Sequence, residues 1–285
     1  MFTHLPADRA RGAFHGAMIG HIFGTALTKH TVTLSALSDA LTPDSIALPS
    51  FPLTPDVRFY QSFFAKRPTA PLSTEELLPL FLQAYDEGPE EIGGQTNAVL
   101  QRVKQGTSPH IAARQVWEEG GQQLAGSGGV KRALPALIFA TQPNVMEEQT
   151  RRLCEFTHVD PRSVGAALFF VRFLRALLFE RWTHPNHTTP LLISLAPTLE
   201  PALRVAHMLP PDTLSNSGYA VTAMQTSYRH FTQTDDFASC LLTTYAQGGD
   251  QGTLGLLAGA FAGAKYGQTQ LPVAWTTAVP FSMTS

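Results

Sequence analysis

Gly248-Gly249-Asp250-Gln251-Gly252-Thr253 opens the stretch of sequence that decides the fold, because a regular series of glycines follows it. Mostly Leu, Ala and Phe separate these glycines, which are Gly255, Gly259, Gly263 and Gly267. A step of four residues keeps them on one face of a helix. Each glycine inside a helix costs ~1 kcal/mol relative to alanine, so the series predicts that another backbone approaches this face closely.

A second glycine series lies near the N-terminus, again with apolar residues between its members, at Gly12, Gly16, Gly20 and Gly24. Membrane helices that dimerise through small residues share this pattern, but His15 and His21 and the short length of the segment argue against one. We therefore expect two glycine-striped helices to pack against each other at the centre of one domain.

Composition limits the class of protein. The chain has 285 residues, a formal net charge of -2 and a sequence pI near 6.5, so it carries no electrostatic signature of nucleic-acid binding. Cys154 and Cys240 lack the spacing of zinc ligands and predict small buried side chains. The longest apolar run, residues 164–179, is interrupted by two arginines and is shorter than the ~20 residues that cross a bilayer. Residues 1–30 make a poor signal peptide, so we expect a cytoplasmic protein without a membrane span.

Apolar residues elsewhere recur at helical rather than alternating spacing. The proline-rich residues 31–57 instead predict a long surface connection. Ser73 and Glu76 form a capping box at the start of one predicted helix. We predict an all-α fold with residues 1–285 as a single domain, and helices at residues 57–64, 74–82, 96–104, 111–124, 145–156, 162–180, 199–205, 220–231 and 237–245.

Two helix entrances offer oxygen atoms to a cation. Asp250 stands among glycines, where a ligand or metal can approach closely, and Thr253 lies one turn further on. Thr54-Pro55-Asp56 precedes the helix predicted at residues 57–64. Asp56 and Asp250 are also explained as helix caps that serve stability alone, which is the simpler interpretation.

A glycine-rich segment, Gly126-Ser127-Gly128-Gly129-Val130-Lys131-Arg132, offers backbone N–H groups to a phosphate. It lacks the spacing of a Walker loop, and its two basic side chains are equally explained as solvated charges. His21 is either a ligand or a hydrogen-bonded residue of the core, and the latter is commoner on an apolar helix face. His158 and Asp160 could form a proton relay, but the simpler interpretation is that they fix a turn.

Four segments occur in order over nearly the whole chain, namely residues 9–24, Gly128-Gly129-Val130-Lys131-Arg132-Ala133-Leu134-Pro135, Thr157-His158-Val159-Asp160-Pro161-Arg162, and Ser217-Gly218-Tyr219 together with residues 248–267. In that order they resemble the opening helix, the glycine-rich substrate loop, the Thr-His turn and the C-terminal signature of the ADP-ribosylglycohydrolases. That family contains the ADP-ribosyl-acceptor hydrolases and the hydrolase that reactivates ADP-ribosylated dinitrogen reductase. The resemblance implies an all-α fold and hydrolysis of a glycosidic bond to ADP-ribose.

The resemblance also implies two magnesium ions, which the family holds with a Thr-Asp-Asp cluster, an earlier glutamate and a Gly-Gly-Asp-x-Asp-Thr loop. Here Pro55 and Gly252 stand at two aspartate positions, His21 replaces the aspartate of the opening helix, and no glutamate lies between Gly24 and Asp56. A dication needs about six oxygen ligands, several of them anionic. We therefore expect at most one weakly held magnesium on the remaining candidates, Thr54, Asp56, Asp250 and Thr253.

The sequence is compatible with two functions. In the first, the chain is a pseudoenzyme with a degenerate magnesium site that binds a protein partner or an ADP-ribose-like ligand, the ligand through Gly128, Gly129, Val130, Lys131 and Arg132. In the second, it is an active hydrolase of N- or O-glycosidic bonds to ADP-ribose with an altered one-metal or metal-free site. Asp56 and Asp250 are then the candidate catalytic residues. Because the carboxylates are so few, we favour the first.

Overall fold

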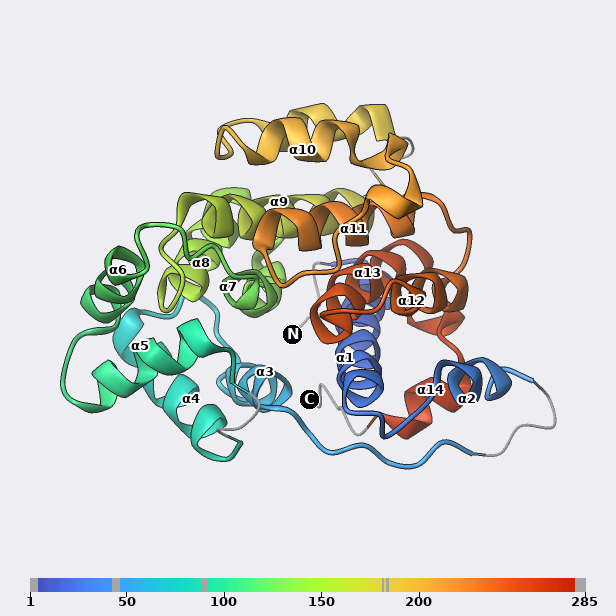
Figure 1. Cartoon of the computed structure of the whole chain (residues 1–285), viewed down its shortest axis with the longest axis horizontal. Coiled ribbons are helices and arrows are strands. Elements are labelled where there is room, and N and C mark those ends of the chain that lie inside the picture. Colours follow the sequence, from blue (N-terminus) through green and yellow to red (C-terminus); the bar gives the residue numbers. More distant parts are fainter. Residues whose placement is uncertain (1–4, 43–46, 89–91, 181, 183–184, 280–285) are drawn as a thin grey trace.

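The computed structural model describes residues 5–42, 47–88, 92–180, 182 and 185–279, and within these ranges all regular elements are helical (Figure 1). These ranges also contain an isolated antiparallel β-bridge between Gly126 and Tyr219. The all-α prediction is confirmed. Both ends of the predicted domain, and Pro43 in the predicted connection, lie outside the described residues.

The α-helices are α1 (Ala7–Thr28), α2 (Leu34–Asp39), α3 (Pro55–Ala65), α4 (Thr74–Asp86), α5 (Gly94–Lys104), α6 (Pro109–Glu119), α7 (Gly128–Arg132), α8 (Pro143–Glu155), α9 (Pro161–Leu178), α10 (Leu199–Val205), α11 (Ala220–Thr232), α12 (Phe237–Ala246), α13 (Gln251–Tyr266) and α14 (Val273–Ala278). Short 3₁₀ helices join them, namely η2 (Leu134–Phe139), η3 (Pro185–Leu192), η4 (Ala206–Met208), η5 (Pro211–Thr213) and η6 (Gln268–Gln270).

The two glycine-striped helices, α1 and α13, pack along each other with their glycines in contact (Figure 1). A Cβ atom on Gly16 would lie 2.2 Å from the carbonyl oxygen of Gly259, and one on Gly259 would lie 2.2 Å from that of Gly16. No side chain fits at these positions, so the predicted packing is confirmed. Gly267 is a correction, because it follows the end of α13 at a φ of +86°, a conformation that favours glycine.

Other helices surround this central pair. Helices α3 and α4 pack together, and the ring of Phe81 on α4 stacks on Phe156 with 3.9 Å between ring centroids. Helix α9 packs against α13, and the ring centroids of Phe173 and Phe261 lie 4.9 Å apart at this contact. Helix α10 lies above α9 and α11 in Figure 1. Phe169, Phe170 and Phe173 on α9 are fully buried in the core.

Capping contacts fix the starts of several helices, and α3 begins at Pro55, two residues before its predicted start. Thr54 caps α3 by accepting from Val57 N, and Ser73 and Glu76 form the predicted capping box of α4. Asp160 caps α9, as expected of a residue that fixes a turn. The predicted helix at residues 111–124 is too long, because α6 ends at Glu119 before the Gly120–Gly121 turn.

Helices α2 and α14 were not predicted. Helix α2 lies inside the region expected to be a surface connection, and α14 follows the striped C-terminal helix. Each has six residues, too few for a helical period to be recognised in the sequence. Both cysteines are buried and free, as predicted. Among the helices described here, none combines the length and the apolar character that a bilayer span requires.

Candidate functional site

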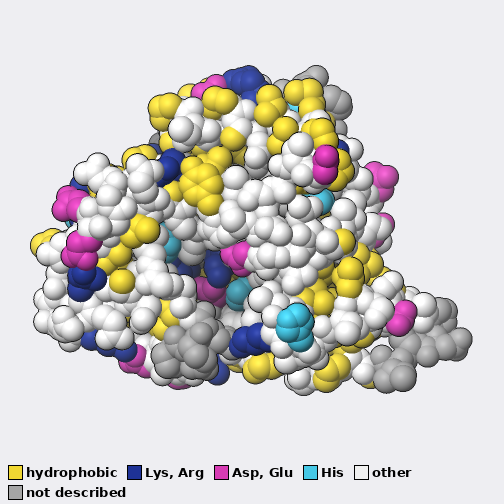
Figure 2. Space-filling model, viewed as in Figure 1, with side chains coloured by type: hydrophobic (Ala, Val, Ile, Leu, Met, Phe, Trp, Pro, Cys, Tyr) yellow, Lys and Arg dark blue, Asp and Glu magenta, His cyan; other side chains and the backbone are white. Residues whose placement is uncertain are grey.

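A polar cleft opens where the N-termini of α3 and α13 meet α7. It has two arms of about 200 and 250 Å³ that share Asp56, Lys131 and Asp250. Figure 2 shows this face of the molecule hollowed near its centre, with acidic, basic and histidine side chains gathered in the hollow. The structure thus brings Thr54, Asp56, Asp250 and Thr253 to one cleft, although their roles as ligands stay predictions.

Both carboxylate oxygens of Asp56 are already engaged by side chains from other helices. Its Oδ2 lies 2.7 Å from the ammonium nitrogen of Lys131, and its Oδ1 accepts a hydrogen bond of 2.5 Å from the hydroxyl of Tyr85. The guanidinium of Arg132 approaches Oδ1 to 3.7 Å. Asp56 is therefore half of a buried ion pair, whereas Thr54 provides the cap of α3.

The charges around Asp56 decide its protonation. Burial alone would raise the pKa of Asp56, but the nearby positive charges of Lys131 and Arg132 outweigh burial and hold this pKa well below its usual range. Burial raises the pKa of Tyr85 far above its ordinary value, so its hydroxyl remains a neutral donor. At neutral pH Asp56 is therefore a carboxylate and Tyr85 is a neutral phenol.

Arg132 is a buried structural cation. Its side chain is only 2% exposed, which rules out the interpretation as a solvated charge. It donates hydrogen bonds to the hydroxyl groups of Tyr85, Thr96 and Thr157. Its guanidinium also lies over the ring of Phe81, 5.6 Å from the centroid. These contacts hold α7 against α4, α5 and the turn after α8.

His21 joins the two helix entrances. Its Nδ1 lies 3.1 Å from the carbonyl oxygen of Gly252, and its Nε2 lies 3.0 Å from the hydroxyl of Thr54. Burial, and then the charge of Lys131, lower the pKa of His21, so the imidazole is neutral. We assign the proton to Nδ1, because a carbonyl oxygen can only accept, and Thr54 then donates to Nε2. The structure places His21 as a hydrogen-bonded residue of the interior.

Asp250 caps α13 through a 3.2 Å hydrogen bond from Thr253 N to its Oδ1. Gly248 and Gly249 precede it at positive φ, and a Cβ on Gly249 would lie 2.2 Å from the carbonyl oxygen of Asn216. The loop is thus built for a tight turn against the segment before α11. The capping interpretation accounts for one oxygen of Asp250, while the residue also lines both arms of the cleft.

The glycine-rich segment divides between the cleft and the core. Gly128, Lys131 and Arg132 line the cleft. Gly129 and Val130 do not. A Cβ on Gly129 would lie 2.6 Å from Sγ of Cys154, and Val130 is fully buried. The expected row of backbone donors is therefore corrected to a short helix, α7, in which one face meets the cleft and the other packs inward.

Several residues of the cleft were not identified from the sequence. Tyr85 and Thr96 lie on the buried faces of α4 and α5, where each is typical of a core position. Others are Gly93, Gly94 and Gln95, just before and within the first turn of α5, and Thr25, Thr28 and Lys29 at the end of α1. The Gly-Gly pair was the available signal, because adjacent glycines allow close approach of a ligand to the backbone.

Few oxygen atoms of the Asp56 and Asp250 carboxylates in this cleft are free to act as metal ligands. Within the residues that the structure describes, no three His, Cys, Asp or Glu side chains converge on a point where a metal ion would bind. One Asp56 oxygen contacts Lys131 and the other accepts from Tyr85, while one Asp250 oxygen caps a helix. A dication would have to displace the ammonium group of Lys131 to reach Asp56.

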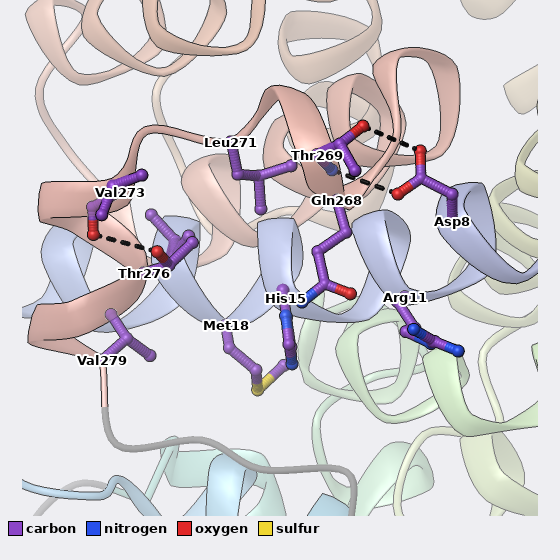
Figure 3. A pocket seen from close by; sticks show the side chains of 11 residues that line it. Asp8, Arg11, His15, Met18, Gln268, Thr269, Leu271, Val273, Thr276 and Val279 are labelled. Carbon is purple, nitrogen blue, oxygen red and sulfur yellow. Dashed lines mark hydrogen bonds between the residues drawn. The ribbon is translucent and has the colours of Figure 1, made fainter.

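A larger cavity of about 610 Å³ lies between α1, η6 and α14 (Figure 3). Its acidic residue, Asp8, accepts hydrogen bonds from both the backbone N–H and the hydroxyl of Thr269. Val279, which lines this cavity, is the last described residue before the undescribed positions 280–285. The polar cleft contains the ion pair of Lys131 and Asp56 and brings Asp250 beside it, so it is the better candidate site.

Comparisons with known proteins agree with this architecture. A family model described as ADP-ribosylglycohydrolase matches residues 3–282. The ADP-ribosyl-[dinitrogen reductase] glycohydrolase of Rhodospirillum rubrum is 33% identical over 157 residues, which cover 53% of this chain and 49% of that relative. The match therefore spans about half of the relative's length. A solved structure titled "ADP-ribosylglycohydrolase-related protein complex" superposes with a TM-score of 0.69 at 21% identity, covering 95% of this chain and 92% of that one. At this identity it supports the fold alone.

Proposed function

Because the chain belongs to the ADP-ribosylglycohydrolase family, we propose that it binds an ADP-ribosyl ligand in the polar cleft without magnesium and serves as a binding or regulatory protein. One observation carries the proposal. The carboxylate of Asp56, which shares the cleft with Asp250, is paired with the ammonium group of Lys131 at 2.7 Å.

Loss of hydrolysis follows from the state of the candidate catalytic groups. Metal sites that cleave such bonds activate water by lowering its pKa, and the engaged oxygens of Asp56 do not support that role. A general base works best with a pKa near the working pH, whereas the pKa of Asp56 is held low by Lys131 and Arg132 in spite of burial. Nδ1 of His158 lies 2.7 Å from the hydroxyl of Thr157, so that ring atom is already engaged.

The walls of the cleft support binding of a sugar nucleotide. Gly93 and Gly94 provide backbone that a ring can approach without meeting a side chain, since a Cβ at either position would meet no atom within 4 Å. Lys131 offers a positive charge to phosphate or hydroxyl oxygens, and Gln95 and Ser127 offer neutral hydrogen-bonding groups. Such a mixture of open backbone and few polar side chains is typical of small-molecule sites.

The alternative, an active hydrolase with a one-metal or metal-free site, rests on a specific observation. Asp56 and Asp250 both line the two arms of the cleft, so two carboxylates reach any ligand bound there. Glycosidases use two carboxylates in this manner. We rank this function second because Asp56 is engaged by two side-chain contacts.

The two functions are separated by metal affinity and turnover. Purified protein is titrated with magnesium and with manganese by calorimetry, and product release is followed on peptides ADP-ribosylated at arginine or serine. We expect weak or no metal binding and no release of ADP-ribose. Micromolar metal affinity together with measurable release would establish the hydrolase instead.

A further inference from the structure

We propose that Lys131 is the built-in cation of the polar cleft. Its ammonium group pairs with the carboxylate of Asp56 in place of a metal ion and so excludes divalent cations from that carboxylate. The same group donates hydrogen bonds to oxygen atoms of the ligand. This inference rests on the proposed metal-free binding of an ADP-ribosyl ligand and names the residue that makes such binding feasible.

The placement of Lys131 supports this role. Its side chain is 17% exposed and lines both arms of the cleft. Its backbone is fixed, because the buried hydroxyl of Tyr60 donates a 2.8 Å hydrogen bond to the Lys131 carbonyl oxygen. An ammonium group has three N–H donors, and the contact to Asp56 engages one of them. The cleft therefore offers a ligand a positive charge whose position is already set by the fold.

A metal ion would also link the two helix entrances, and here His21 makes that link. Its imidazole connects Gly252 at the start of α13 with Thr54 at the start of α3. His21 is only 4% exposed. Charge neutralisation by Lys131 and cross-linking by His21 together replace both contributions of a metal to this part of the structure.

Restoring the missing aspartates is therefore not enough to restore a metal site. Pro55 is the first residue of α3, where an aspartate is favourable for the helix dipole. A Cβ on Gly252 would lie 2.9 Å from the hydroxyl of Thr25, a side-chain atom that can rotate away. Both positions can therefore accept aspartate, yet the ammonium group of Lys131 would still be paired with the carboxylate of Asp56. Metal binding should return only when Lys131 is removed as well.

The metal arm of the test compares Pro55→Asp/Gly252→Asp with the triple variant that adds Lys131→Met. Manganese affinity is measured by calorimetry and by the electron paramagnetic resonance signal of free manganese. We expect the triple variant to bind manganese at least about tenfold more tightly than the double variant, since removal of the competing ammonium frees an anionic ligand. Equal affinity of the double and triple variants would overturn the claim that Lys131 excludes the metal.

The ligand arm measures binding of ADP-ribose in the presence of EDTA. Lys131→Met should weaken binding by about tenfold to a hundredfold, the loss expected for a charge-assisted hydrogen bond, while Lys131→Arg should retain most of the affinity. The control is Lys104→Met, because Lys104 pairs with Asp86 on the surface at the far end of α5. Binding by Lys131→Met at the wild-type level would overturn the ligand role.

Folding and the parent proposal are checked separately. Circular dichroism and thermal unfolding are recorded for each variant, and Lys131→Gln, which keeps a neutral donor for Asp56, replaces Lys131→Met if that variant does not fold. If the wild-type protein fails to bind ADP-ribose at all, the proposed function is wrong, while the manganese comparison still decides whether Lys131 excludes a metal. If the wild type binds and the Lys131 variants bind equally well, only the role of Lys131 is wrong.

Discussion

The ammonium group of Lys131 on α7 lies 2.7 Å from Oδ2 of Asp56 on α3, inside a cleft that also contains Asp250. The carboxylate that the sequence singles out as an oxygen ligand is thus neutralised by a neighbouring helix. Arg132 and Tyr85 approach the other oxygen, so the pair belongs to a buried network. Removing one member of such a network leaves charge without compensation, which is costly in a protein interior.

Replacing Asp56 by Asn should lower the free energy of unfolding by about 3 kcal/mol, because Lys131 and Arg132 would keep buried charges without their anion. Urea unfolding followed by circular dichroism measures the loss. Asp86→Asn is the matched control, since Asp86 pairs with Lys104 at the exposed surface and should change stability by less than about 1 kcal/mol. Similar losses in the two variants would contradict a buried, functionally coupled pair.

Replacing Gly259 by Leu should destabilise the protein by several kcal/mol, at or above the upper end of the ~1–3 kcal/mol typical of overpacking, because the new side chain would have to displace the backbone of α1. A Cβ at this position already lies 2.2 Å from the carbonyl oxygen of Gly16. Gly94→Ala serves as the control, since a Cβ there meets no atom within 4 Å. Thermal unfolding of both variants is the measurement, and a mild effect of Gly259→Leu would argue against the close helix packing.

This central packing is the part of the fold that the sequence predicts best. A glycine repeated every fourth residue in two helices has few explanations other than backbone contact, and Gly16 and Gly259 do meet. The repeat fails at its last member, Gly267, because the pattern gives no sign that α13 ends one residue earlier. Helices α2 and α14 were missed for another reason, since six residues complete less than two helical turns.

The candidate site could be predicted only in part. Asp56 and Asp250 each stand at a helix entrance, which the sequence indicates, and in the structure both line the cleft. The pairing of Asp56 with Lys131 depends on how α3 and α7 come together, which no local pattern contains. Tyr85 illustrates the same limit, because its hydroxyl reaches Asp56 from a helix face that otherwise packs into the core.

Acidification should weaken the fold in part through His230. Burial, together with the charge of Arg229, lowers the pKa of His230 to about 4. In the unfolded chain a histidine titrates near pH ~6.5. The unfolded state therefore binds more protons between these values, so the stability associated with neutral His230 is present above pH ~6.5 and is lost as the pH falls toward ~4.

The measurement is the free energy of unfolding of the wild type and of His230→Leu across this pH range. The wild type should lose about 1–3 kcal/mol more than the variant between pH ~7 and ~4. His110→Leu is the control, because His110 is exposed on α6. Parallel pH profiles for the wild type and His230→Leu would contradict a buried neutral imidazole.

The most direct test of the account is a calorimetric titration of the wild-type protein with ADP-ribose, once in EDTA and once in excess magnesium. Because Lys131 already neutralises Asp56, the account predicts saturable binding with the same affinity in both buffers, within about a factor of two, a difference of ~0.4 kcal/mol. Binding that appears only with magnesium, or that strengthens by about tenfold or more when magnesium is added, would contradict it.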